Sequence, residues 1–362
     1  MSREQFLTVE SELKSRFIDR DDEIRGLSLA ALSGQHLLML GPPGNAKTQL
    51  IKAFTEYLGG ACFKWSLNEF TAPDEILGPV SLQGLKSDIY RRNTAGKLPE
   101  ADVGYLDEIF KANSPILNTL LPILQERVFF NDSVETPVPL LFLMGSSNEL
   151  PPEDEGLAAL YDRFVLRYNP GYISDPGQFA QLLTLKNGQR RTEPITRETL
   201  IADRAIVAGM STAVGPDTIE SLTLVWSRLR EEAHVVLSDR RWRQTLLIMA
   251  AESWLSGATE VTPESLLVGI HVFWDKPDQI RTVSQIVRSC INPGLAKARA
   301  IETAATEAMR ELSSLKDVTQ FIQLLTQLRQ LRTDIGGLTQ TAPVVVIRNQ
   351  LDSYIQTVRE KL

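Results

Sequence analysis

Gly41-Pro42-Pro43-Gly44-Asn45-Ala46-Lys47-Thr48 is the stretch of this sequence that decides the fold. It lies between a continuous apolar run, His36–Leu40, and a segment with helical spacing, Thr48–Leu58. A glycine-bearing turn between a buried strand and a helix suits a polyphosphate, because backbone N–H groups converge there and the helix N-terminus favours negative charge. The stretch therefore predicts a phosphate-binding loop.

Individual residues of this loop have expected roles. Gly41 and Gly44 allow the chain to turn tightly, and Lys47 would reach the β and γ phosphates. Thr48 would place its hydroxyl on Mg²⁺. The usual pattern, G-x-x-x-x-G-K-[ST], has a second glycine where this sequence has Ala46. The alternative is a Pro-Gly turn with an incidental lysine, which would leave the polar residues at the ends of later strands unexplained.

Short apolar runs recur along the first half of the chain, and segments with helical spacing separate them. Strands that alternate with helices are typical of a doubly wound α/β domain with a parallel sheet. The expected strands after the first are Cys62–Leu67, Ala101–Leu106, Leu140–Gly145 and Phe164–Tyr168.

Two carboxylates and an amide follow two of these runs. Asp107 and Glu108 come directly after Val103–Leu106, and Asn148 ends the segment that begins at Leu140. Ligands of parallel α/β sheets bind at the carboxyl ends of the strands, so these side chains are expected at one edge. There Asp107 would hold Mg²⁺, Glu108 would orient and deprotonate an attacking water, and Asn148 would contact the γ-phosphate or that water.

Two arginines complete the set of candidate residues. Arg163 precedes the last apolar run, and Arg240 begins a helical segment further along the chain. An arginine fork stabilises charge on a transferring phosphoryl group, and an arginine from a neighbouring subunit would connect hydrolysis with assembly. The alternative for either residue is an ordinary surface or ion-paired arginine.

The patterns predict three parts of the chain. Residues 1–172 are expected to form an α/β nucleotide-binding domain, and the strand pattern stops after Tyr172. Residues 173–293 are expected to be all-helical. Residues 294–362 have leucines spaced by three and four from Leu312 to Leu331 and a break at Gly336-Gly337, which predicts a C-terminal helical hairpin.

Composition argues against several classes of protein. A formal charge of -7 with no basic or aromatic stripe argues against nucleic-acid binding and against a nucleic-acid motor. Every apolar run is far shorter than the roughly 20 residues that cross a bilayer, and the N-terminus lacks a secretory pattern, so we expect a cytoplasmic protein with no membrane span. Two distant cysteines and three scattered histidines give no zinc-ligand spacing.

Taken in order, these features resemble an AAA+ ATPase, and their details resemble the MoxR family and its RavA branch. The resemblance covers roughly residues 10 to 290 and implies a P-loop module with a parallel sheet flanked by helices, followed by an all-helical lid. The details that carry it, beside the phosphate loop, are Leu77–Ser81, Leu98–Asp102, Leu106–Ile109, Ala112–Leu121 and Ser147–Pro151.

The resemblance also implies named roles for the candidate residues. The loop Gly41–Thr48 would bind ATP, and Thr48 and Asp107 would bind Mg²⁺. Arg241 stands beside Arg240 and is an alternative to it as the arginine called sensor 2. The implied roles are Walker A for Lys47 and Thr48, Walker B for Asp107 and Glu108, sensor 1 for Asn148, a trans-acting arginine finger for Arg163, and sensor 2 for Arg240.

Members of this family usually form hexameric rings that act with a partner carrying a von Willebrand factor A domain, in chaperone-like maturation of client proteins or in metal-cofactor insertion. The segment Phe70–Lys97 corresponds to the family's insert in helix 2, and Val128–Pro137 to a hairpin before sensor 1, so both are candidate client-contact regions. The RavA branch usually carries a small β-rich domain in its C-terminal helices, whereas Gly336–Pro343 has room only for a turn.

The leading hypothesis is therefore an ATP-driven ring that remodels a client protein. The alternatives are a dedicated activator of one enzyme, such as the rubisco activases related to MoxR, a gas-vesicle assembly ATPase, and a nucleotide-gated scaffold with little turnover. The complete set of candidate hydrolytic residues argues against the scaffold, because a scaffold need not keep them all. These residues are Lys47, Asp107, Glu108, Asn148 and Arg163.

Overall fold

A computed structural model describes residues 2–132, 134–151, 155–185, 192–291, 293–310, 312, 317–338 and 342–360. The chain forms two compact units. The first comprises Met1–Val214 and Val235–Ile280, and the second comprises Gly215–His234 and Arg281–Leu362. The domain boundaries that the sequence predicts, after residues 172 and 293, differ from the boundaries of these two units. The predicted domains stay predictions.

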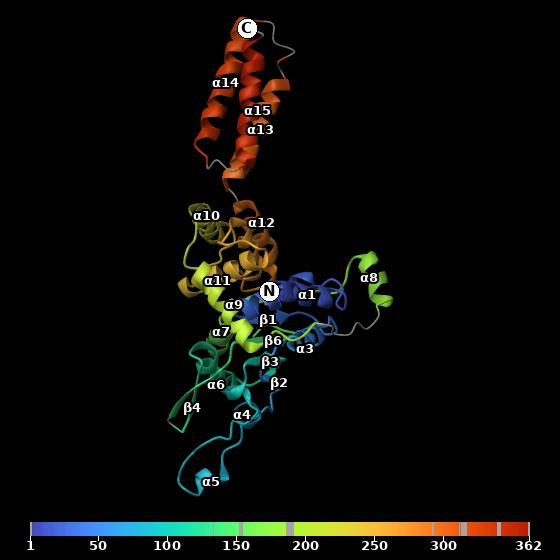
Figure 1. Ribbon diagram of the computed structural model, residues 1–362, viewed down its shortest axis with the longest axis vertical. Helices are drawn as coiled ribbons and strands as arrows, with labels where there is room; N and C mark the ends of the chain where they lie inside the picture. Colours follow the sequence, from blue (N-terminus) through green and yellow to red (C-terminus); the bar gives the residue numbers. More distant parts are fainter. Residues whose placement is uncertain are drawn as a thin grey trace. The chain divides into compact units, whose positions relative to one another are not determined.

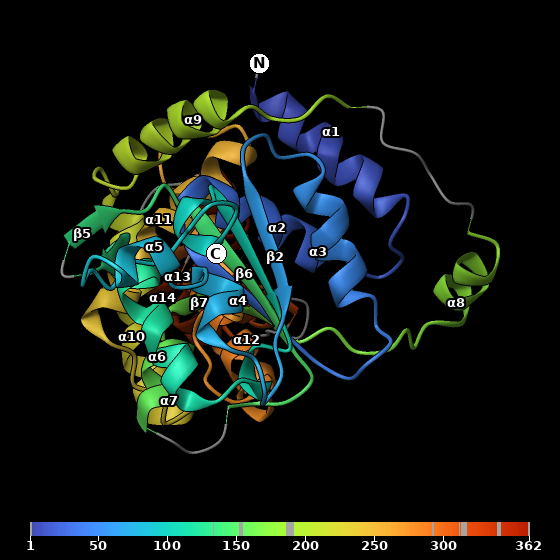
Figure 2. The same ribbon diagram turned by 90° about the horizontal axis from the view of Figure 1, so that it is seen from below.

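A five-stranded parallel sheet is the centre of the first unit, with the strand order β2-β3-β6-β1-β7 (Figures 1 and 2). All residues of β1, β6 and β7 are buried, which explains their continuous apolar runs. All five predicted strands are thereby confirmed. Their bounds are β1 (His36–Leu40), β2 (Cys62–Ser66), β3 (Val103–Asp107), β6 (Phe142–Ser147) and β7 (Phe164–Tyr168).

Helices cover this sheet as a doubly wound fold requires. The helix α2 (Asp21–Ser33) packs on β1 and β7, and α3 (Lys47–Thr55) packs on β3 and β6. The other helices of this part are α1 (Ser2–Lys14), α6 (Ser114–Gln125), α7 (Glu155–Tyr161) and the short η2 (Ile109–Lys111).

The two segments predicted as an insert and a hairpin are present between β2 and β6. The antiparallel hairpin is formed by β4 (Val128–Asn131) and β5 (Val134–Pro137), as the sequence predicts. Short helices occur along the insert and just after it: α4 (Pro73–Leu77), α5 (Leu82–Leu85) and η1 (Leu98–Glu100).

Helices also form the remainder of the first unit, beyond β7. The helices α9 (Arg197–Met210) and α11 (Asp239–Leu255) pack on each other and on α2. The smaller elements are α8 (Pro176–Leu183), η3 (Pro263–His271) and η4 (Pro277–Gln279).

The second unit contains α10 (Pro216–Glu232), α12 (Ile280–Cys290), α13 (Pro293–Arg310), α14 (Val318–Gly336) and α15 (Ala342–Arg359). The predicted hairpin is formed by α14 and α15, and α13 packs beside them as a third helix around a shared apolar core. The helix α14 begins at Val318, where the Asp317 side chain caps it by accepting a hydrogen bond from Thr319 N. Residues 313–316 of the predicted leucine-spaced stretch lie outside the described residues. Within the described part of the chain, no helix has the length and apolar character that crossing a membrane requires.

Candidate functional site

The predicted phosphate loop connects the end of β1 to the start of α3. Its backbone departs from the usual right-handed region at three positions, with φ of 153° at Gly41, 81° at Gly44 and 68° at Ala46. Ala46 is the N-cap of α3 and stands where the usual motif has its second glycine. An L-residue in the left-handed region carries strain, and such strain tends to be kept at functional sites.

Lys47 is buried at the base of this loop. Its ammonium donates hydrogen bonds to Gly41 O (2.7 Å), Pro42 O (2.8 Å) and Asn45 Oδ1 (3.0 Å). Burial lowers the pKa of Lys47, and the carboxylates of Glu108 and Asp107 oppose that shift. The loop therefore holds one cation directly beneath the backbone that would surround a phosphate.

Thr48 and Asp107 face each other across the start of α3 and the end of β3. The Thr48 hydroxyl lies 3.3 Å from Asp107 Oδ1 and 3.2 Å from Asp107 Oδ2. Ser146, from β6, also donates a hydrogen bond to Asp107, and Tyr105 OH lies 2.9 Å from the Ser146 hydroxyl. Hydroxyl and carboxylate oxygens are the ligands that Mg²⁺ prefers, so Thr48 and Asp107 fit this cation.

Glu108 follows Asp107 in a left-handed conformation, with φ of 54° and ψ of 43°. Its Oε1 accepts a hydrogen bond from Asn148 Nδ2. Its Oε2 is buried, makes no hydrogen bond with any described residue, and lies 3.5 Å from Lys111 Nζ. The strained backbone thus directs one carboxylate oxygen to the amide at the end of β6 and the other toward Lys111.

Asn148 completes the group, because its Oδ1 accepts a hydrogen bond from Lys47 Nζ at 3.1 Å. One cleft of about 300 Å³ is lined by the phosphate loop and by Lys47, Thr48, Asp107, Glu108 and Asn148. The five residues come from the ends of two neighbouring strands, β3 and β6, and from the start of one helix, α3. The structure therefore brings them together as the sequence predicts.

A second and larger cleft, of about 650 Å³, adjoins the first and was not predicted from the sequence. Both clefts share Gly44, Asn45, Ala46 and Gln49. No single motif marks the second cleft, since its walls come from segments far apart in the chain. Its further lining includes Arg16, Phe17, Ile18 and Arg20 after α1, and Tyr172, Ile173, Phe179, Leu182 and Leu185 after β7.

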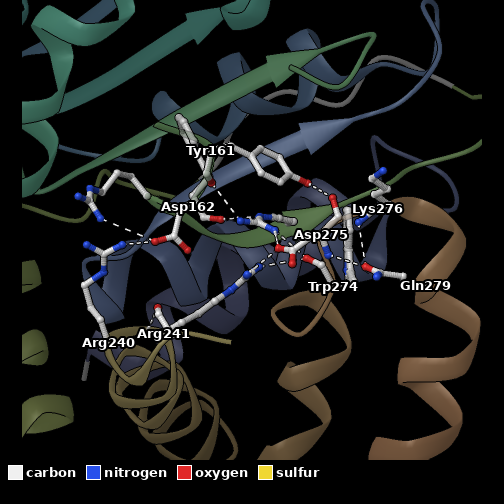
Figure 3. A network of polar contacts seen from close by, with 12 residues as sticks. Tyr161, Asp162, Arg240, Arg241, Trp274, Asp275, Lys276 and Gln279 are labelled. Carbon is white, nitrogen blue, oxygen red and sulfur yellow. Dashed lines mark hydrogen bonds and ion pairs between the residues drawn. The ribbon is translucent and has the colours of Figure 1, made fainter. Parts of the chain in front are cut away.

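The structure does not bring the two candidate arginines to the phosphate loop. Among the described residues that line the two clefts, neither Arg163 nor Arg240 is present. Both arginines instead contact Asp162, the first residue after α7. Figure 3 shows Arg240 beside Asp162. Arg240 forms an ion pair with Asp162 Oδ2, and Arg163 Nη1 lies 3.8 Å from the same oxygen and bonds Gln125 through Nη2.

Arg241, the alternative to Arg240, is buried in a separate network (Figure 3). It donates to Asp275 Oδ1 at 2.8 Å and to Trp274 O at 3.0 Å, and Arg167 donates to the same Oδ1 at 2.7 Å. Burial opposes ionisation of Asp275, but Arg241 and Arg167 lower its pKa. Arg241 is thus held by a half-exposed carboxylate and a backbone carbonyl oxygen, contacts that give it a structural role.

Comparison with known families agrees with this geometry. A family model described as the MoxR domain of MoxR-vWA-β-propeller ternary systems matches residues 4–208. A second model, described as an AAA lid domain, matches residues 217–287. The two matches lie on the α/β part of the chain and on the helices that follow it.

Several known proteins are similar to this chain. The uncharacterized protein MJ0079 of Methanocaldococcus jannaschii is 31% identical over 364 residues, which are 97% of this chain and 93% of that protein. The chaperone MoxR1 of Mycobacterium tuberculosis is 29% identical over 170 residues, which are 45% of this chain and 43% of MoxR1. A solved structure of a candidate ATPase from Cytophaga hutchinsonii matches this chain with a TM-score of 0.60 and 16% sequence identity. The match covers 80% of this chain and 93% of that structure, and it shows a similar fold.

Proposed function

The chain belongs to the MoxR family of AAA+ ATPases, and we propose that it hydrolyses MgATP in the cleft beside the phosphate loop in order to remodel another protein. The observation that carries this proposal is the position of Asn148 between Lys47 and Glu108. A group that contacts both the phosphate-binding lysine and the candidate base can align the attacking water with the γ-phosphate.

Each residue of the cleft has a chemical task in this proposal. Lys47 binds the β and γ phosphates, and Thr48 and Asp107 would hold Mg²⁺, which neutralises charge on those phosphates when it is bound. Glu108 orients the attacking water and accepts its proton through its carboxylate, whose Oε1 also accepts a hydrogen bond from Asn148. Asn148 fixes the carboxylate relative to the lysine.

Arg163 and Arg240 act in this proposal on the nucleotide of a neighbouring copy of the chain. Support comes from their shared contact with Asp162 and from their absence among the described residues lining the two clefts. A second copy that presents its cleft to this arginine pair would obtain the positive charge that stabilises a transferring phosphoryl group. A closed ring, with six copies as in the family, gives every cleft such a neighbour.

The insert, residues 70–97, and the hairpin of β4 and β5 form the proposed client-contact surface. Asn131 ties the two segments together, since its Oδ1 accepts from Arg92 N at 2.8 Å and its Nδ2 donates to Arg92 O at 3.1 Å. Exposed large apolar side chains on one tied surface favour contact with another protein. These side chains are Phe70, Leu82, Leu85, Ile89 and Tyr90 of the insert and Phe130 and Val134 of the hairpin.

The description of the matching family model supports a partner with a von Willebrand factor A domain, and it names a β-propeller protein as a third component. The RavA branch stays a prediction, as does maturation of a particular client.

The experiment that tests the function measures ATP hydrolysis across protein concentration, with the mass of the assembly measured in parallel. We expect turnover to rise more steeply than linearly as copies associate, because each cleft needs the arginines of its neighbour. Tight ATP binding with negligible turnover in every assembly state, with and without a von Willebrand factor A partner, would instead favour a nucleotide-gated scaffold and overturn the proposal.

A further inference from the structure

The guanidinium of Arg163 is folded against its own chain. Only 15% of the Arg163 side chain is exposed. Its Nη2 donates a hydrogen bond to Gln125 Oε1, and its Nη1 lies 3.8 Å from Asp162 Oδ2. An arginine that acts on the nucleotide of a neighbouring copy has to reach beyond its own surface. Arg163 is therefore retracted in this structure.

The retracted position leaves one donor of Arg163 unsatisfied. Its Nε is buried and makes no hydrogen bond with any described residue. A buried donor without a partner is unfavourable, because it has lost its hydrogen bonds to water. Extension of the side chain would bring Nε to water or to a phosphate oxygen, so some contact has to hold the guanidinium back.

The contact with Gln125 is the better candidate for this hold. Asp162 Oδ2 already forms an ion pair with Arg240, and at 3.8 Å it attracts Arg163 without a hydrogen bond. In the part of the chain that the structure describes, Gln125 Oε1 is the acceptor that the Arg163 guanidinium bonds. Hydrogen bonds from a charged donor are stronger than those between neutral groups. Gln125 thus supplies the directional contact.

Gln125 also has a distinctive place in the fold, because it is the last residue of α6 and β4 begins three residues later at Val128. The Arg127 side chain donates to Leu124 O at 2.7 Å, and the Arg127 carbonyl oxygen accepts from Val138 N at 2.7 Å. The end of α6 and the base of the proposed client-contact hairpin are therefore bonded to each other. A shift of this helix end would alter the contact between Gln125 and Arg163.

We propose that Gln125 is a positioning residue for Arg163: it holds the guanidinium in the retracted position and so sets how often Arg163 reaches the γ-phosphate in a neighbouring copy. This inference rests on the proposed function, since Arg163 has to act on a neighbour's nucleotide. Gln125 is not among the described residues that line either cleft. Its effect on turnover therefore passes through Arg163.

The first test measures ATP hydrolysis by the full chain, at a concentration where every variant has the same assembled mass. Gln125→Ala removes the acceptor and should raise kcat about threefold, the scale of one net hydrogen bond. Gln125→Glu places a carboxylate beside the guanidinium and should lower kcat about threefold. Neither change should alter the KM for ATP, because Arg163 would contact the phosphoryl group in the transition state.

The matched control is Glu126→Ala. Glu126 is the next residue along the chain and is exposed, and no hydrogen bond or ion pair joins it to Arg163 among the described residues. This variant should keep the kcat of the unaltered protein. A lower kcat in Gln125→Ala, a shift in the same direction in both Gln125 variants, or an unchanged kcat in both would overturn the proposal.

The second test asks on which chain Gln125 acts, using a mixture of Lys47→Ala and Arg163→Ala chains. In this mixture the Lys47→Ala chain supplies the arginine and the Arg163→Ala chain supplies the cleft. Gln125→Ala added to the Lys47→Ala chain should raise the recovered turnover about threefold. The same change on the Arg163→Ala chain should have no effect, because no arginine is left there to hold. An equal effect on either chain would indicate a general structural role and overturn the proposal.

Failure of the proposed function gives a different result. An unaltered protein without turnover in any assembly state would overturn the proposed function and this inference together. Turnover in the unaltered protein without recovery in the mixture would assign Arg163 to its own chain, and would overturn the inference and the trans-acting role. Recovery in the mixture that does not depend on which chain carries Gln125→Ala would overturn the inference alone.

Discussion

The side chain of Asn148 joins Lys47 to Glu108, accepting a hydrogen bond from the lysine ammonium at 3.1 Å and donating one to the glutamate carboxylate. The amide is thus in contact with the group that would bind phosphate and with the group that would activate water. A change at the γ-phosphate can reach β6 through this one side chain. The proposed catalytic geometry therefore depends on an asparagine that has no charge of its own.

Asn148→Ala should reduce kcat and leave the KM for ATP nearly unchanged. The kcat should fall by roughly 10²-fold, in line with the loss of one positioned polar group. Lys47 keeps three other oxygen partners, so ground-state binding should persist. Steady-state kinetics check this, with Asn68→Ala outside the cleft as the control. A raised KM with unchanged kcat would mean that Asn148 serves binding alone.

Glu108→Gln should retain ATP binding and assembly and lose turnover. The amide has the size of the carboxylate but cannot accept the proton of the attacking water, so the rate should fall by roughly 10²–10⁴-fold. Nucleotide titration measures ATP binding, mass measurement follows assembly, and phosphate release measures turnover. Glu149→Gln is the matched control, because Glu149 is exposed and is not among the described residues that line the cleft. Full turnover in the Glu108 variant would remove it as the base.

Much of the site can be predicted from sequence because strand ends are local features. A buried strand of five residues bounded by glycine and proline is visible as an apolar run, and the carboxyl ends of parallel strands meet at one sheet edge. These two facts are enough to bring Lys47, Asp107, Glu108 and Asn148 together. No tertiary contact has to be known beforehand.

The position of Arg240 depends on tertiary packing and could not be predicted in this way. The sequence does not reveal that the start of α11 lies against the turn after α7, where Asp162 contacts both arginines. The second cleft, of about 650 Å³, was missed for the same reason, since its walls come from the loop after α1, from α3 and from the chain after β7. Residues such as Phe17 and Phe179 have no shared motif, because their meeting is a property of the folded chain.

The arginine pair predicts complementation between inactive variants. If Arg163 and Arg240 act on a neighbour's nucleotide, a mixture of Arg163→Ala and Lys47→Ala chains should recover part of the activity, because some mixed interfaces contain one intact cleft and one intact arginine pair. Arg240→Ala mixed with Lys47→Ala should behave in the same way. ATP hydrolysis across mixing ratios measures this. Recovery with Arg163→Ala but not with Arg240→Ala would separate the two arginines, and no recovery with either would assign both to their own chain.

Buried Glu23 predicts a pH dependence of stability. Burial raises the pKa of Glu23 to about 7, from an ordinary value of 4.5. The folded-state pKa lies above the unfolded-state value, so the contribution of Glu23 to stability is fully present below about pH 4.5 and is lost as pH rises through about 7. Glu23→Gln places a neutral group of similar shape at this position. The variant should be more stable than the unaltered protein by up to about 3 kcal/mol at pH 8.

Urea unfolding at pH 5, 6, 7 and 8 checks this prediction, because the difference between the two proteins should shrink as the pH falls. A difference that stays constant from pH 5 to pH 8 would contradict a raised pKa at Glu23.

Ala46→Gly should stabilise the protein. Ala46 adopts φ of 68° and ψ of 13°, a left-handed conformation that costs an L-residue about 1–2 kcal/mol and costs glycine little. Part of the gain is offset by the greater freedom of glycine in the unfolded chain, so the free energy of unfolding should rise by roughly 0.5–1 kcal/mol. Ala205→Gly is the control: Ala205 is exposed within α9, and glycine there should lower the free energy of unfolding by about 1 kcal/mol. Urea unfolding measures both, and a loss of stability in both variants would mean that the Ala46 backbone is not strained.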